Sequence, residues 1–163
     1  SLISPSSGTG TVLGHSISEP QKYLSSVGAM IEGPAFYPYL SGRDNLARFD
    51  SADSSADPKT RATRVQSALE RVGLTHASEK KVHAYSLGMK QRLGIANALL
   101  QPRQLLILDE PTAVLTPLEV DELFENLKKL KTVKYFAFDT ETSGLDPITA
   151  ELLGISFSCS KAE

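Results

Sequence analysis

The apolar residues between positions 58 and 73 recur at the spacing of one face of an α-helix. They are Ala62, Val65, Ala68, Leu69 and Val72. Asp57 can cap such a helix, and Pro58 suits its first position because that position needs no N–H donor. Gly73 suits the left-handed residue that often follows a helix end. We therefore expect a helix here, with this apolar face in the core.

Further helices follow from the same kind of pattern. Ser86 can cap a helix whose body runs over residues 87–100 without an internal proline. Residues 116–119, Thr-Pro-Leu-Glu, match a capping box with proline at the first helical position. The buried stripe of that helix is expected to consist of Val120, Leu123, Phe124, Leu127 and Leu130. Another helix is expected to begin near Ser41 or Asp44, either of which can cap it.

Short apolar runs between these helices predict β-strands. They cover residues 11–17, 27–31, 105–108, 133–138 and 152–157. The run at 105–108, Leu-Leu-Ile-Leu, is expected to be buried on both faces, as in a central parallel strand, and it stops at Asp109 and Glu110. Such strands present their carboxyl ends to ligands. Because strands alternate with helices, we predict an α/β fold with a partly parallel sheet, flanking helices and a helical portion.

Composition limits the function classes. The 163 residues, 40% of them hydrophobic, are enough for roughly one domain with its own core. A formal net charge of −2 argues against a surface dominated by nucleic-acid contacts. The single cysteine, Cys159, excludes a disulfide framework. No apolar run approaches the roughly 18 residues of a membrane-spanning helix, so we expect no direct membrane insertion.

The first residues, Ser1 to Pro5, lack the basic and apolar regions of a signal peptide. A start at Ser1 suggests that upstream residues were removed or never included. We expect a soluble cytoplasmic protein.

Two segments have residues that can bind an anion and a metal ion. Ser86 and the backbone N–H groups of Leu87 and Gly88 begin a helix, where an anion is stabilised. Gly88 would let the backbone approach a phosphate closely. Asp109, at a strand end, can hold Mg²⁺. Glu110 beside it can orient or deprotonate a water that attacks a terminal phosphate.

Residues 85–92, Tyr-Ser-Leu-Gly-Met-Lys-Gln-Arg, and residues 105–112, Leu-Leu-Ile-Leu-Asp-Glu-Pro-Thr, resemble the signature sequence and the Walker B segment of ATP-binding cassette (ABC) ATPases. In that family, two nucleotide-binding domains sandwich two ATP molecules. The resemblance implies that Ser86, Leu87, Gly88 and Gln91 contact the nucleotide of a second domain. It also implies that Asp109 binds Mg²⁺ and that Glu110 is the general base.

The resemblance extends over residues 1–131, including the helical portion at about 42–100. Residues 27–46 resemble the Q-loop region of drug- and bacteriocin-exporter ATPases, with Glu32 in place of the usual glutamine as a nucleotide-site residue. Residues 113–131 resemble the D-loop and following helix of sugar-importer ATPases. The implied function is ATP hydrolysis that powers transport, with a membrane permease as a further partner.

The phosphate-binding loop of this family is missing from the sequence. No Gly-x-x-x-x-Gly-Lys-Ser/Thr occurs among the 163 residues, and that loop and its lysine cradle the phosphates. The switch histidine is also missing, because His15, His76 and His83 lie far upstream of its place. We therefore expect a truncated P-loop NTPase-like fragment that binds ATP and Mg²⁺ weakly or not at all when isolated, and is inactive alone.

Residues 132–163 resemble something else. Residues 135–158, with Phe-Asp-Thr-Glu at their core, resemble the first motif of the 3′–5′ exonuclease domain of DNA polymerase I-type enzymes. Asp139 and Glu141 would share one face of a strand. Paired carboxylates can hold the metals of a phosphodiester-cleaving site. Only this alternative implies nucleic acid as a partner, and the family also needs aspartates further downstream.

The chain thus combines ABC segments with an exonuclease-like segment. The predicted strand at 133–138 of that segment occupies the place where an ABC domain would have its next strand. We expect the tail to pack on the same sheet. Three hypotheses remain open: an ABC nucleotide-binding fragment, a metal-dependent exonuclease-like fragment, and a non-catalytic artificial or chimeric domain.

Overall fold

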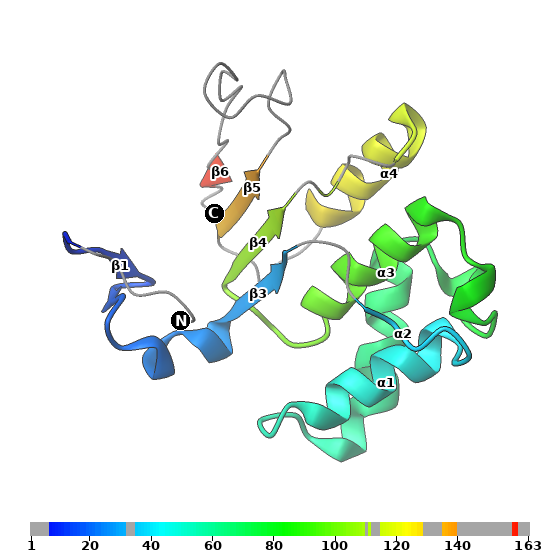
Figure 1. The fold of residues 1–163 in the computed structure, drawn as a ribbon, viewed down its shortest axis with the longest axis horizontal. Coiled ribbons are helices and arrows are strands. Elements are labelled where there is room, and N and C mark those ends of the chain that lie inside the picture. Colours follow the sequence, from blue (N-terminus) through cyan, green and yellow to red (C-terminus); the bar gives the residue numbers. More distant parts are fainter. Residues whose placement is uncertain are drawn as a thin grey trace.

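A four-stranded sheet in the order β3-β4-β5-β6 organises the computed structural model, with the helices to one side and a separate β1-β2 hairpin (Figure 1). The structure describes residues 7–31, 35–109, 111, 115–128, 135–139 and 158–159. The strands and α-helices are β1 (Thr11–Val12), β2 (His15–Ser16), β3 (Val27–Met30), α1 (Gly42–Ala52), α2 (Arg61–Arg71), α3 (Leu87–Ala98), β4 (Leu105–Asp109), α4 (Pro117–Lys128), β5 (Tyr135–Asp139) and β6 (Ser158–Cys159). Short 3-10 helices are η1 (Pro20–Lys22), η2 (Leu24–Ser26), η3 (Pro58–Thr60), η4 (Thr75–Ala77) and η5 (Val82–Ala84).

Strands β3, β4 and β5 run parallel, and β4 lies between the other two. Leu105 pairs with Val27 on one side and with Tyr135 on the other. Strand β6 runs antiparallel to β5 through the pair Tyr135 and Cys159. The predicted α/β fold with a partly parallel sheet is confirmed, and the strand expected over residues 133–138 is β5, beside β4.

Strand β4 is buried unevenly. The side chains of Leu106 and Leu108 are fully buried, whereas Leu105 and Ile107 are partly exposed. Because alternate residues of a strand point to opposite faces, the described elements cover the face of Leu106 and Leu108 more completely than the other. The expectation of burial on both faces is therefore wrong for one face.

The predicted strand over residues 11–17 is a hairpin instead. Strands β1 and β2 pair antiparallel, with Val12 opposite His15. The turn residues Leu13 and Gly14 have positive φ values of 51° and 80°, as in the tight turns that match strand twist. Leucine rarely adopts a positive φ, so the turn could not be distinguished from an extended apolar run.

The helix expected between Asp57 and Gly73 forms in two parts. Pro58 begins the turn η3, which Asp57 caps by accepting a hydrogen bond from the Lys59 N–H at 2.9 Å, and α2 follows. Gly73 has φ of 69°, as expected for the residue after a helix end. The buried members of the predicted face are Val65, Ala68, Leu69 and Val72. Ala62 is exposed instead, because it lies in the first turn of α2, outside the buried part of that face.

Helix α3 packs against α1 and against strand β3. The side chain of Ser41 accepts a hydrogen bond from the Asp44 N–H at 3.0 Å, so Ser41 is the cap of α1. At the end of α3, a methyl group on Gly28 of β3 would overlap the carbonyl oxygen of Ala98. Gly28 therefore permits the close approach of strand and helix. Helices α1 to α3 fall within the predicted helical portion at about 42–100, whose boundaries stay a prediction.

Helix α4 begins at Pro117, as expected, and the carbonyl of Thr116 accepts a hydrogen bond from the Val120 N–H at 3.0 Å. Leu123 of the predicted stripe is 2% exposed. The strand expected over residues 152–157 lies outside the described residues. Within the described part of the chain, no helix has both the length and the hydropathy that crossing a bilayer requires.

Candidate functional site

Ser86 caps α3 and remains accessible. Its side-chain oxygen accepts a hydrogen bond from the Met89 N–H at 3.1 Å, and its carbonyl accepts one from the Lys90 N–H at 3.0 Å. Ser86 and Leu87 are exposed, Leu87 by 64%, whereas Gly88 is buried. The start of α3 therefore presents the Ser86 hydroxyl and Leu87 to solvent, and the N–H groups of Leu87 and Gly88 have no acceptor within the helix.

The predicted contacts of this segment lie together. Leu87, Gly88 and Gln91 share one face of α3, because residues three and four apart in a helix are neighbours. Gln91 is partly buried there. The unpaired N–H groups and the helix dipole both favour an anion at this position.

Asp109 stands at the carboxyl end of β4 and is partly exposed. The backbone register places Asp139, the last residue of β5, directly beside it. On the other side, Met30 ends β3 opposite Leu108. The carboxyl ends of three parallel strands thus meet at one edge, which is where α/β sheets bind ligands.

Several predicted site residues lie outside this description. Glu32, Glu110 and Glu141 are outside the described residues, and Asp139 is described through its backbone. Among the residues that the structure does describe, no three His, Cys, Asp or Glu side chains are grouped to hold a metal ion. Asp109 nevertheless suits Mg²⁺, which binds through one or two carboxylates together with substrate phosphates.

The structure places Ser86 and Asp109 apart. Helix α3 contains 12 residues and is therefore about 18 Å long. Its last residue, Ala98, touches β3 at Gly28, so Ser86 lies a full helix length away from that contact. Figure 1 shows α3 beginning away from the sheet, apart from the end of β4. The two predicted motifs do not form a single site within this chain.

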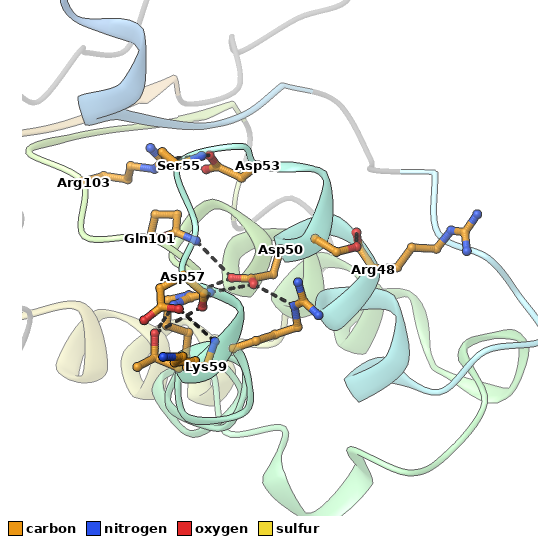
Figure 2. Close-up of polar contacts among 12 residues, drawn as sticks. Arg48, Asp50, Asp53, Ser55, Asp57, Lys59, Gln101 and Arg103 are labelled. Carbon is orange, nitrogen blue, oxygen red and sulfur yellow. Dashed lines mark hydrogen bonds and ion pairs between the residues drawn. The ribbon is translucent and has the colours of Figure 1, made fainter.

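A polar cluster around Asp50 was missed by the sequence analysis (Figure 2). Asp50 is fully buried on α1. Arg64 donates to its Oδ1 from Nε at 2.8 Å and to its Oδ2 from Nη2 at 2.7 Å. Arg61 Nε donates to Oδ2 at 3.1 Å, and Gln101 Nε2 donates to Oδ1 at 3.0 Å. One carboxylate therefore joins α1, α2 and the segment after α3.

The charge of Asp50 is stabilised by these partners. Burial alone would raise the pKa of Asp50, but the hydrogen bonds from Arg64 and Arg61 and their positive charges lower the pKa below its usual value. The available sequence signal was weak: Asp50 follows the buried Leu46 by four residues and so shares its helix face. A charged residue at a core position is expected to be paired, but its partners could not be identified.

A second ion pair fixes the end of α1. Arg103 Nη2 lies 2.9 Å from Asp53 Oδ2, and Arg103 Nη1 also donates to the carbonyl oxygen of Ser25. The side chain of Asp53 accepts a hydrogen bond from the Ser55 hydroxyl at 2.6 Å and another from the Ser55 N–H at 2.9 Å. Arg103 therefore links the end of α1 to the residues just before β3.

A cavity of about 240 Å³ opens between β3, α1 and the end of α3. Its lining includes Gly28, Asp53 and Arg103, but neither Ser86 nor Asp109. It is smaller than the roughly 300 Å³ from which ligand pockets usually start. Ser86 and Asp109 therefore lie outside this cavity.

Comparison with known families gives two matches along the chain. Residues 1–113 match a family model described as ABC transporter. Residues 111–163 match a model described as 3′–5′ exonuclease. The two matched regions meet just after β4.

Curated relatives match over most of this chain. The uncharacterized ABC transporter ATP-binding protein YdbJ of Bacillus subtilis (strain 168) is 44% identical over 130 residues, which are 79% of this chain and 41% of that protein. The bacitracin transport ATP-binding protein BcrA of Bacillus licheniformis is 41% identical over 139 residues, which are 83% of this chain and 44% of that protein. The chain thus spans about two fifths of the length of these relatives.

Solved structures also resemble the fold. The structure of cbiO1 from Clostridium perfringens, part of the ABC transporter complex cbiONQ, superposes with a TM-score of 0.71 at 29% identity, covering 86% of this chain and 58% of that one. The dimeric ATP-binding cassette MJ0796 bound to ADP and Pi superposes with a TM-score of 0.64 at 16% identity, covering 84% and 71%. This second likeness concerns the fold alone.

Proposed function

Because this chain belongs to the ABC transporter family of ATP-binding proteins, we propose that it contributes the signature half of an ATP site to a partner domain that has its own phosphate loop. The 163 residues contain no Gly-x-x-x-x-Gly-Lys-Ser/Thr. Such a loop supplies most of the backbone donors and the lysine that hold nucleotide phosphates. The nucleotide would therefore be held by the partner and contacted by this chain.

The accessible, Ser86-capped start of α3 is the observation that supports this proposal. The Ser86 oxygen already accepts a hydrogen bond from Met89, and a hydroxyl has one proton to donate in addition. That proton, with the N–H groups of Leu87 and Gly88, can be donated to the terminal phosphate of the partner's nucleotide. Gln91, one turn along the same face, would contact the same phosphate region.

The other half of the proposed chemistry lies at the carboxyl edge of the sheet. Asp109 would bind Mg²⁺, which neutralises charge on the phosphate oxygens when it is bound. Glu110 would accept the proton of the attacking water, and Glu32 would lie near the metal, both on the basis of sequence resemblance. Without a phosphate loop within reach, these residues have no bound nucleotide to act on in the isolated chain.

We propose a second nucleotide-binding domain and a membrane permease as partners, at the cytoplasmic side of a membrane. BcrA is described as a bacitracin transport protein, and cbiO1 as part of a transporter complex. The separation of Ser86 from Asp109 supports the need for a second nucleotide-binding domain, because one chain cannot place both segments on one phosphate.

A complementation assay tests the proposal. The partner is an ABC ATPase domain that has a phosphate loop but whose own signature serine is replaced by alanine. Adding this chain is expected to restore its ATP hydrolysis, and Ser86→Ala is expected to reduce the restored rate by at least about tenfold, as for loss of a donor to a developing charge.

Asp57→Ala is the matched control. Asp57 caps η3 through the same kind of bond, from the Lys59 N–H at 2.9 Å, so its loss costs a similar stability of about 1 kcal/mol. It should leave the restored rate unchanged. Equal losses in the two variants, or no restoration by the wild-type chain, would contradict the proposal.

The carboxyl-terminal family match favours a second candidate, a metal-dependent 3′–5′ exonuclease-like fragment. Strand β5 ends at Asp139, beside Asp109, and Asp139 and Glu141 would be its metal ligands. Release of nucleotides from a single-stranded oligonucleotide with Mg²⁺ or Mn²⁺, abolished by Asp139→Ala, would support it.

The two family matches meet at residues 111–113, which supports a chimeric origin. A non-catalytic chimeric domain would show no activity in either assay.

A further inference from the structure

Tyr85, the residue just before Ser86, is almost completely buried. It is 5% exposed, and its Oη donates a hydrogen bond to the carbonyl oxygen of Ala77 at 2.7 Å. Its ring end lies against Gly42, the first residue of α1. A methyl group on Gly42 would overlap Tyr85 Oη and would lie 3.2 Å from Cζ. The hydroxyl therefore occupies a space between the start of α1 and the turn η4.

The surrounding backbone connects the same two regions. The Gly42 N–H donates to the Lys80 carbonyl at 3.3 Å, and the Arg43 N–H donates to the Ser78 carbonyl at 2.9 Å. In the other direction, the Val82 N–H donates to Leu40 at 3.0 Å. The segment that leads into Ser86 is thus hydrogen-bonded along the entry to α1, and Tyr85 closes this arrangement next to the cap.

The environment keeps the Tyr85 hydroxyl a donor. Burial raises its pKa, and the charge of Glu79 raises the pKa further. A protonated hydroxyl can donate to Ala77, whereas an ionised one could not. Because a buried donor without an acceptor is costly, the position of this ring is restricted to where the bond can form.

We infer that Tyr85 is a positioning residue for Ser86, and that Gly42 is glycine because the Tyr85 hydroxyl fills the space of its side chain. The inference rests on the proposed function of Ser86 as a phosphate contact. The start of α1 and the cap of α3 would then move as one unit, so that a displacement of Tyr85 displaces Ser86.

The test is a double-mutant cycle with Gly42→Ala and Tyr85→Phe in the full chain. Gly42→Ala keeps a helix-compatible residue but pushes the tyrosine oxygen, and it should lower the restored ATPase rate at least about tenfold by misplacing Ser86. Tyr85→Phe keeps the ring and should lower the rate by about twofold, the factor that matches the low end of one hydrogen bond's net contribution. The double variant should recover most of the way to the level of Tyr85→Phe, because without the oxygen the methyl group lies 3.2 Å from Cζ, a contact that a small shift of the ring relieves.

Two substitutions of the same type serve as controls. Tyr23→Phe removes a hydroxyl that donates to the Ile17 carbonyl at 3.3 Å, far from α3 along the chain. Gly10→Ala adds a methyl group that meets Ile17 at an ordinary 3.5 Å. Neither should change the restored rate.

Backbone amide chemical shifts of Ser86, Leu87 and Met89 in the free chain provide a readout that needs no partner. They should move in Gly42→Ala and return in the double variant. If the wild-type chain restores no ATPase activity, the proposed function fails, and these shifts still decide whether Tyr85 sets the position of Ser86. Unmoved amide shifts in Gly42→Ala, or a double variant no better than Gly42→Ala, would overturn the inference.

Discussion

Arg64 binds both carboxylate oxygens of Asp50, with its Nε 2.8 Å from Oδ1 and its Nη2 2.7 Å from Oδ2. The Asp50 side chain has no exposed surface, and that of Arg64 is 15% exposed. A bidentate pair fixes the relative orientation of two helices as well as their distance. The pair therefore determines how α1 packs on α2, the two helices that follow the sheet strand β3.

Asp50→Asn should lower the free energy of unfolding by about 3 kcal/mol, the lower end of the range for breaking a buried ion pair. The amide keeps the size of the carboxylate but leaves Arg64 and Arg61 without a buried negative partner. Urea unfolding followed by circular dichroism at pH 7 measures the change.

The matched control is Glu19→Gln. Glu19 pairs with Lys22 at 2.6 Å, but both side chains are 40% or more exposed. Such surface pairs contribute little, so the expected loss is below about 1 kcal/mol. Equal losses at Asp50 and Glu19 would show that burial of the Asp50 pair has no energetic consequence.

The contribution of Asp50 should depend on pH with a defined sign. Its pKa in the folded chain is lower than in the unfolded chain, because the hydrogen bonds from Arg64 and Arg61 outweigh the effect of burial. The folded state therefore gains stability above the unfolded pKa of about 3.9, and that gain is lost as the pH falls through the folded pKa. The difference in free energy of unfolding between wild type and Asp50→Asn should therefore stay at its full value from about pH 5 to 7. It should decrease below about pH 4. A difference that grows on acidification would refute this assignment.

Gly28→Ala should destabilise the chain by about 2 kcal/mol, within the range for overpacking a close contact. The added methyl group would overlap the Ala98 carbonyl oxygen and lie 3.2 Å from Leu106, so helix and strand must separate. Thermal unfolding compared with Gly10→Ala, whose methyl group meets only ordinary contacts, isolates this effect. Similar midpoints for the two variants would mean that β3 and α3 are less closely packed than described.

The local features of this fold could be predicted because each depends on neighbouring residues. Ser86 caps α3, and Gly73 adopts φ of 69° after α2, as their positions along the sequence indicate. The apolar run ending at Asp109 forms the inner strand β4. These features could be predicted because helix caps and short apolar strands are determined by residues that are close together in the sequence.

The remaining features depend on residues that are distant in the chain. Asp50 meets Arg64 14 residues later and Gln101 51 residues later, so no local pattern identifies the partners of Asp50. The contact between Gly42 and Tyr85 likewise depends on how α1 and η4 pack. Leu13 shows a different limit, since its positive φ is imposed by the hairpin against its own preference.

The isolated chain should bind ATP with Mg²⁺ more weakly than about 1 μM, a standard free energy of about 8 kcal/mol. The physical reason is that the sequence lacks the phosphate-binding loop. The start of α3 at Ser86 offers only a few hydrogen-bond donors. Asp109 lies on a separate element, where no phosphate oxygens complete a metal site. Isothermal titration calorimetry measures the affinity directly.

Thermal unfolding provides an independent measurement, because a ligand that binds only the folded state raises its stability by RT ln(1 + [L]/Kd). At about 1 μM ATP with Mg²⁺, we expect no measurable shift of the midpoint for the isolated chain. We expect a shift when the partner domain with its phosphate loop is present and this chain has Ser86. Asp109→Asn should not alter the free chain's response, since no metal–nucleotide complex is held there. Tight binding by the free chain that Asp109→Asn abolishes would instead place a complete nucleotide site within these 163 residues, and the dependence on a partner would be wrong.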